Sequence, residues 1–250
     1  MATGADDRSG ASERAGDAGD DARAAAVATD AALARRLQIL ATEHWGLLAA
    51  RSTAQNEVLT RISIYLTLVS AGLVTIGLLG QATRFGSWFP VAALAILGFL
   101  TVVGLLTLIR MLTISEEDMM FVVAMNRIRG GYADVDPTAA EYFLASTHDD
   151  FVGMTVTYSF LRRRGGFEQV LGSSLIMSAL VTGSVGGMFA GGLCAALGVP
   201  TGGAVTIGVV VGLGVVATTA WYGGYRFTGS WRTYTPRRPS AGPPAQWGPR

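Results

Sequence analysis

The chain has 250 residues, of which 50% are hydrophobic and 15% charged, and its mean hydropathy is +0.40. This composition excludes an ordinary soluble globular domain. All basic residues apart from two histidines are arginines, and the absence of lysine excludes a Walker A site, a Schiff base and a Ser-Lys dyad. The single cysteine, Cys194, excludes an internal disulfide and a CxxC pair, and two histidines cannot build a three-histidine zinc site.

The first part of the chain, residues 1–61, is polar and divides in two. Residues 1–30 are rich in Ala, Gly and Asp and poor in large apolar groups, which predicts a disordered acidic tail. Residues 31–61 carry leucines near a 4-3 spacing, which His44 and Arg51 interrupt. They are Leu33, Leu37, Leu40 and Leu47. The stripe is too imperfect for a long coiled coil and predicts an amphipathic helix that packs on the middle loop, on itself or on the membrane surface.

Four uncharged apolar stretches follow, at residues 62–80, 88–109, 170–199 and 204–225. Each is near or above the roughly 20 residues that a helix needs to cross a bilayer, so the sequence predicts two transmembrane hairpins, 62–109 and 170–226. The spans hold no Asp, Glu, Arg or His. This argues against a proton-coupled transporter or a voltage sensor, but a pore lined by backbone and hydroxyl groups stays open.

The arginines give the expected orientation. They gather before the first span, between the second and third spans and after the fourth, whereas the two short connections carry only Arg84 between them. Arginine excess marks the cytoplasmic side of a membrane. The sequence therefore predicts a multi-pass protein of the cell membrane with both termini and the loop 110–169 in the cytoplasm.

Small residues recur every four positions in the last two spans. One row is Gly183, Gly187, Gly191 and Ala195, and the fourth span carries Ala204, Gly208 and Gly212. A second row runs beside the first, through Ser174, Ser178, Thr182, Gly186 and Ala190. Because helices associate in lipid through close backbone approach, such rows mark contact faces. Three hypotheses follow: a tight hairpin of the third and fourth spans, a contact with a second protomer, or a glycine-lined pore.

The loop 110–169 predicts a set of short cytoplasmic helices. Residues 115–118 resemble a helix start with a cap and an acidic first turn, and Gly130-Gly131 would end that helix. Asp136-Pro137 predicts another start, with Thr138 and Glu141 as a capping box, and a further helix would run from Phe151 to Arg164. We expect this loop to pack on the 31–61 helix through Met119, Val122, Val123, Tyr142, Phe143 and Phe160. The alternative is that these apolar residues lie in the headgroup region of the membrane as interfacial helices.

Only His148, Asp149 and Asp150 could hold a metal or perform acid-base chemistry. Adjacent residues do not share a helix face, so a helix cap with a solvated turn is the main interpretation, with an ion pair to Arg127 or Arg129 as the alternative. No metal site and no cofactor is predicted. The run Arg162-Arg163-Arg164 sets topology and could also contact anionic lipid headgroups. Residues 227–250 are rich in Pro and Arg and predict a disordered tail.

Several short motifs resemble a family of uncharacterised actinobacterial four-span integral membrane proteins. They are Leu48-Ala49-Ala50-Arg51-Ser52, Asn56-Glu57, Met125-Asn126-Arg127-Ile128-Arg129, Tyr142-Phe143 and His148-Asp149-Asp150. The resemblance covers residues 33–225 and supplies no activity.

The predicted fold class is an all-α membrane protein with four transmembrane helices, an N-terminal cytoplasmic helix and a helical cytoplasmic loop between spans two and three. The first functional hypothesis is a non-enzymatic oligomeric scaffold or accessory subunit. Its partners would be the lipid bilayer, further copies of the chain and a cytoplasmic protein bound through 31–61 and 110–169, with no nucleic acid. The second is a channel or pore-forming effector gated by the cytoplasmic helices. A membrane enzyme has least support, because no nucleophile-base pair is visible.

Overall fold

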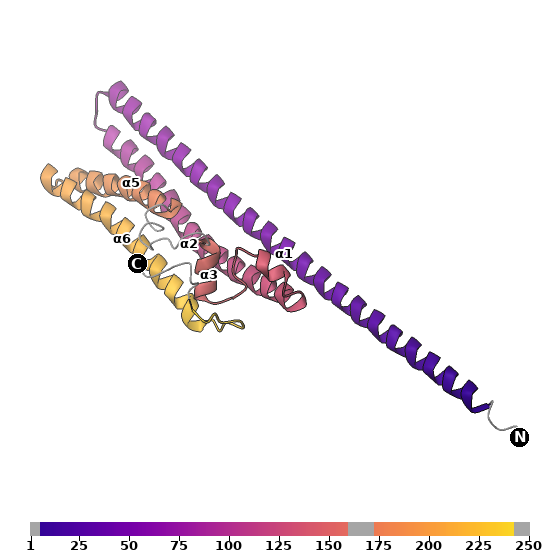
Figure 1. The fold of residues 1–250 in the computed structure, drawn as a ribbon. Coiled ribbons are helices and arrows are strands. Elements are labelled where there is room, and N and C mark those ends of the chain that lie inside the picture. The colour runs from indigo at the N-terminus through magenta and orange to yellow at the C-terminus, as the bar shows by residue number, and fades with distance from the viewer. Residues whose placement is uncertain (1–5, 160–172, 243–250) are drawn as a thin grey trace, which may run out of the picture.

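The computed structural model describes residues 6–159 and 173–242, with the side chains of residues 6–22 and 24 left out. Within these ranges every regular element is helical, in the order α1, α2, η1, α3, α5 and α6 (Figure 1). Four of the helices are long and apolar enough to cross a membrane.

The first two helices are much longer than single spans. Helix α1 runs through Asp6–Thr83, so it joins residues 6–30, the 31–61 helix and the first span without a break. The chain has no proline before Pro90, and the Ala-rich composition of residues 22–34 favours a helix. Residues 23 and 25–39 are all exposed, and the helix therefore continues there without support from the rest of the fold. Disorder of the acidic tail stays a prediction.

Helix α2 runs through Phe89–Val135 and corrects two predicted boundaries. The predicted helix start at residues 115–118 is wrong: the Ser115 hydroxyl donates to the carbonyl of Met111 within a continuous helix. The predicted end at Gly130-Gly131 is also wrong, since the helix continues until Asp136 adopts an extended conformation before Pro137. Glu116 and Asp118 pair with arginines of neighbouring helices, and Glu117 pairs with Arg110 within α2. These ion pairs replace the capping role that the sequence suggests.

Two short elements follow α2. The helix predicted after Asp136-Pro137 is a single 3-10 turn, η1, at Ala139–Tyr142. The capping box is wrong because Asp136 itself caps the turn, with its Oδ1 accepting from Thr138 N–H at 2.9 Å. Helix α3 begins at Phe151, as predicted, and ends at Tyr158. The remainder of the predicted helix, 160–164, lies outside the described residues together with Phe160.

Helices α5 at Ser174–Ala196 and α6 at Thr201–Thr233 form the second hairpin. Helix α5 begins later than the predicted third span because the Ser173 hydroxyl caps it, accepting from Ile176 N–H. Helix α6 continues beyond the predicted boundary at 226. The first part of the predicted tail 227–250 is therefore helical through Thr233, and residues 234–242 are non-helical.

The two hairpins lie side by side in an up-down-up-down arrangement. Helix α5 lies between α6 and α2, and the turns at 84–88 and 197–200 lie at the end of the bundle away from α3 (Figure 1). Side chains from three helices fill the centre of the bundle. They are Tyr65 and Val69 on α1, Leu97 and Leu100 on α2, and Val185 on α5.

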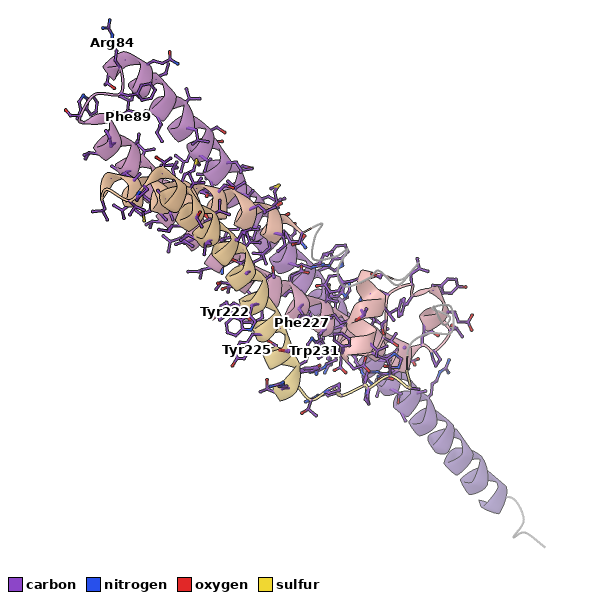
Figure 2. All side chains as sticks on the ribbon, turned by 90° about the vertical axis from the view of Figure 1, so that its left-hand side faces the viewer. Arg84, Phe89, Tyr222, Tyr225, Phe227 and Trp231 are labelled. Atoms are coloured by element: carbon purple, nitrogen blue, oxygen red, sulfur yellow. The ribbon has the colours of Figure 1, made fainter. Side chains whose placement is uncertain are left out.

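The opposite end of the bundle carries most of the charges, and we call residues 40–61, 110–158 and 226–242 the polar end. Its core consists of Met119, Val122, Val123, Met125 and Met154, with Leu47, Trp231 and Tyr234 packed against it. Leu40 lies against Gly131, so α1 does cover α2 here. In contrast, Tyr142 is 84% exposed and Leu33 and Leu37 are exposed, so these predicted contacts are wrong. Figure 2 shows Trp231 and Phe227 of α6 at this end, far from Arg84 and Phe89.

Candidate functional site

The acidic residues of α2 join three neighbouring helices at the polar end. Glu116 forms an ion pair with Arg226 on α6, in which Nη2 and Oε2 are 2.5 Å apart. The next two acids turn to the other side of α2, where Glu117 pairs with Arg110 and Asp118 pairs with Arg51 on α1. Helix α2 therefore acts as the central element that holds α1 and α6 in place.

Asp118 accepts hydrogen bonds from side chains of both α1 and α3. Arg51 Nε donates to its Oδ1 at 2.6 Å, Gln55 Nε2 donates to the same oxygen at 2.9 Å, and Tyr158 donates its hydroxyl to Oδ2 at 2.5 Å. Burial raises the pKa of Asp118, but the hydrogen bonds from Arg51 and Tyr158 outweigh it and keep the pKa below its ordinary value. Burial, with the bond to Asp118, raises the pKa of Tyr158, which stays protonated as a donor.

The ion pair between Arg110 and Glu57 lies at the boundary between the polar end and the spans. Arg110 donates to both carboxylate oxygens of Glu57, at 3.0 and 2.8 Å, and Arg61 donates to Oε1 at 2.9 Å. These hydrogen bonds from Arg110 and Arg61 lower the pKa of Glu57 to about 2. The bidentate geometry fixes α1 against α2 where both helices enter the apolar region.

Asp149 has no exposed surface and accepts four hydrogen bonds. Its Oδ2 accepts from Arg127 Nε at 2.7 Å, from the Tyr234 hydroxyl at 3.0 Å and from the backbone N–H of Arg237 at 3.2 Å. Its Oδ1 accepts from the backbone N–H of Arg238 at 2.8 Å. Burial raises the pKa of Asp149, but the bonds from Arg238 N–H and Arg127 outweigh it, so the pKa is lowered and the residue is a buried anion.

Asp150 has two roles. Its Oδ1 accepts from Gly153 N–H at 2.7 Å and caps α3, while its Oδ2 accepts from the backbone N–H and the hydroxyl of Ser240 at 2.7 and 2.6 Å. Of the interpretations of His148-Asp149-Asp150, the structure therefore combines the helix cap, at Asp150, with the ion pair to Arg127, at Asp149. The solvated turn is wrong for Asp149, because the C-terminal segment covers it.

Asn126 holds the loop before α3 in position and is fully buried. Its Nδ2 donates to the carbonyl of His148 at 3.0 Å, and its Oδ1 accepts from the Thr157 hydroxyl and from Arg129 Nη1, both at 2.8 Å. A neutral side chain with every polar atom bonded fits a structural role rather than acid-base chemistry. Within residues 23–159 and 173–242 no group of three or more His, Cys, Asp or Glu side chains is placed to hold a metal ion.

The predicted glycine rows lie between α5 and α6. A Cβ atom at Gly183 would stand 2.6 Å from the carbonyl oxygen of Gly212, and one at Gly187 would stand 2.5 Å from that of Gly208. At Gly191 the nearest atom is the carbonyl oxygen of Ala204, at 2.9 Å. Ala195, the last member of the row, is exposed. The first three positions thus bring two backbones into direct contact within the hairpin.

The second small-residue row of α5 faces α1 and α2. A Cβ at Gly104 of α2 would stand 2.5 Å from the Tyr65 hydroxyl and 2.8 Å from Thr182 Oγ1. Three hydroxyls in this region, those of Tyr65, Ser178 and Thr182, are buried without a hydrogen-bond partner. The arrangement places unpartnered polar groups inside an otherwise apolar bundle.

The run Arg162-Arg163-Arg164 lies outside the described residues, so lipid contact there stays a prediction. The most important residues that the sequence does not reveal are Tyr234, Arg238 and Ser240, because the composition of residues 227–250 predicts a disordered tail. The sequence contains one weak indication of this contact, because Asp149-Asp150 in the loop and Arg237-Arg238 in the tail have opposite charges.

No family model matches the chain, and no curated protein or solved structure is similar to it. The resemblance to a family of four-span membrane proteins therefore stays a prediction.

Proposed function

We propose that the protein is a non-enzymatic, oligomeric membrane scaffold or accessory subunit that recruits a partner through the outer part of α1. The observation that carries this proposal is the run of exposed residues 25–39, in which Leu33 and Leu37 continue the leucine stripe beyond the point where α2 covers it. Isolated helices are marginally stable in water, whereas helices in proteins gain most of their stability from packing of an apolar face. A helical partner on Leu33 and Leu37 would supply that packing.

The partner that we propose is α1 of a second copy. Two copies in one membrane present their α1 helices in parallel and at the same height, so the two leucine stripes are in register without any further device. Self-complementary contacts of this kind are the basis of most homo-oligomers.

The test is the double variant Leu33→Arg/Leu37→Arg, measured by native mass spectrometry in detergent and by crosslinking in native membranes. The wild type is expected to be oligomeric and the variant monomeric. Ala28→Arg/Ala31→Arg is the matched control, because it adds the same charge to the opposite, equally exposed face of α1. A monomeric wild type, or a variant with an unchanged mass, would reject α1 as the contact.

A channel or pore-forming effector is the second candidate. The observation that favours it is the set of buried, unpartnered hydroxyls of Tyr65, Ser178 and Thr182, which could line a polar path. Against it, Gly183, Gly187 and Gly191 of α5 already lie against the backbone of α6. Flux of ions from liposomes that contain the purified protein separates the two candidates: a scaffold gives no flux above that of empty liposomes.

We further propose that the polar end and both termini lie in the cytoplasm. The positive-inside pattern supports this orientation. Single cysteines at Arg84 and at Asp134, in a Cys194→Ala background, test it with an impermeant thiol reagent on intact cells. We expect labelling at 84 and none at 134, and the opposite pattern would reverse the orientation.

A further inference from the structure

The C-terminal segment 234–240 lies against the polar end of its own chain. It leaves α6 at Tyr234 in an extended conformation and lies against three carboxylates from separate parts of the polar end. These are Asp134 near the end of α2, Asp149 before α3 and Asp150 at its N-cap, and we call them the aspartate cradle.

The cradle binds the segment mainly through groups that any extended peptide carries. Asp149 accepts the backbone N–H groups of two successive residues, Arg237 and Arg238. Asp150 accepts the next available pair, the N–H and hydroxyl of Ser240, at 2.7 and 2.6 Å. Recognition of backbone donors by fixed carboxylates is insensitive to most side chains, and it requires a segment that is not already in a helix or a sheet.

Two side chains add selectivity. Arg238 Nη1 donates to Asp134 Oδ2 at 2.6 Å, and the stem of Arg238 crosses Gly130, where a Cβ atom would stand 2.5 Å from its Nε. Gly130 therefore leaves room for this arginine. The hydroxyl of Ser240 donates a hydrogen bond to Asp150 and is the second selective contact. The three carboxylates together favour a basic segment.

The contacts of the segment are partly accessible to water. The Arg238 and Asp134 side chains are 33% and 46% exposed, Arg237 is exposed and Ser240 is half-buried. The Arg238–Asp134 bond is exposed, whereas the bonds to Asp149 and Asp150 are part-buried. Non-helical segments that water reaches in this way belong to the parts of a protein that open most readily. When the segment leaves, the buried Asp149 carboxylate becomes accessible with its partner Arg127 beside it.

From this geometry we infer that the aspartate cradle is a binding site for extended basic peptide segments. Residues 234–240 of the chain itself occupy this site and thereby block it for a partner. The ligand is a protein segment with two successive free backbone N–H groups, an arginine at the second of them, and a serine or threonine two residues later. The tail in cis competes at an effective concentration on the order of millimolar, so a partner binds only when the tail is released.

The test uses the full-length protein in detergent and a fluorescein-labelled peptide with the sequence of residues 233–242. Fluorescence anisotropy measures peptide binding to the wild type, to Arg238→Ala/Ser240→Glu, and to that variant with Asp149→Asn added. The double variant loosens the tail in cis by removing one anchor and placing a like charge against Asp150. A peptide with Ser240→Pro, which lacks both the N–H and the hydroxyl at that position, is the control ligand.

We expect the double variant to bind the peptide about tenfold or more tightly than the wild type, and the addition of Asp149→Asn to remove at least that gain. A spin label at Gly242→Cys in the Cys194→Ala background reports the tail itself and should become mobile in the double variant. A mobile tail without peptide binding would overturn the inference, because the contacts would then be only an intramolecular clasp. A tail that stays immobile would overturn it as well, since these contacts would not be what holds it.

Discussion

Replacing Gly187 with alanine is the sharpest test of the packing between α5 and α6. The added Cβ atom would stand 2.5 Å from the carbonyl oxygen of Gly208 and 3.3 Å from its carbonyl carbon. Ordinary van der Waals contact begins at about 3.4 Å, so the backbones must separate locally by roughly 0.9 Å. Because the obstacle is backbone, no side-chain rotation can relieve the clash, and the neighbouring contacts at Gly183 and Gly191 weaken together.

The expected magnitude follows from two opposing effects. Overpacking of this kind costs about 1–3 kcal/mol, while the replacement of glycine by alanine in a helix gains up to about 1 kcal/mol. Gly214 on α6 is the matched control, because nothing lies within 4 Å of a Cβ atom there. Both variants share the helix-propensity gain, so the difference between their free energies of unfolding, about 1–3 kcal/mol, isolates the contact.

The assay is thermal unfolding of the purified proteins in detergent, followed by circular dichroism at the same protein-to-detergent ratio. Gly187→Ala should unfold several degrees below Gly214→Ala, which should match or exceed the wild type. Equal unfolding temperatures for the two variants would refute the close approach of the helices at Gly187. A change in native mass without a change in stability would instead assign the row to a contact between copies.

Three further predictions concern the polar end. Asp149→Ala leaves Arg127 and two backbone N–H groups without their acceptor and should lower the free energy of unfolding by about 2–3 kcal/mol in thermal or urea unfolding. This is below the roughly 3–5 kcal/mol for a fully buried ion pair, because Arg127 is 40% exposed. Tyr158→Phe removes the 2.5 Å bond to Asp118 and should cost about 1–2 kcal/mol, whereas Tyr142→Phe, at a position 84% exposed, should cost nothing measurable. Folding lowers the pKa of Glu57 from 4.5 to about 2, so this carboxylate stabilises the protein above pH 4.5 and that stability is lost as the pH falls toward 2. Glu57→Gln should flatten this part of the curve of unfolding temperature against pH, and an unchanged slope would contradict the assignment.

The apolar part of the fold could be predicted because a membrane imposes a strong and local signal. A stretch without charges and of sufficient length is required for each span, and each of the four predicted stretches overlaps one of the four long apolar helices. The close approach of α5 and α6 also has a local signal, since small residues at every fourth position share one face.

The polar end could be predicted only in part. Residues 115–118 have the composition of a helix start, yet they lie inside α2 because their acids pair with arginines on α1, α2 and α6. A cap and a tertiary ion pair use the same residue types, and a local pattern does not distinguish them. The tail shows the same difficulty over a longer range: Tyr234 bonds to Asp149, which lies 85 residues earlier. Asp149, the acceptor that orders the tail, lies elsewhere in the sequence, so the composition of the tail does not indicate it.

Helix α1 runs without a break from the polar end into the first span, so it can transmit a sideways force between them. The ion pairs at Arg51 and Glu57 hold the helix at the polar end, about 40 Å from Arg23 on one side and about 40 Å from Thr83 on the other. A rigid rod held at a fulcrum moves its two ends in opposite directions. A sideways pull by a protein on the outer part of α1 would therefore press the inner part against its contacts with α2, where Gly72 of α1 lies against Leu100 and Gly104 of α2 lies against Tyr65.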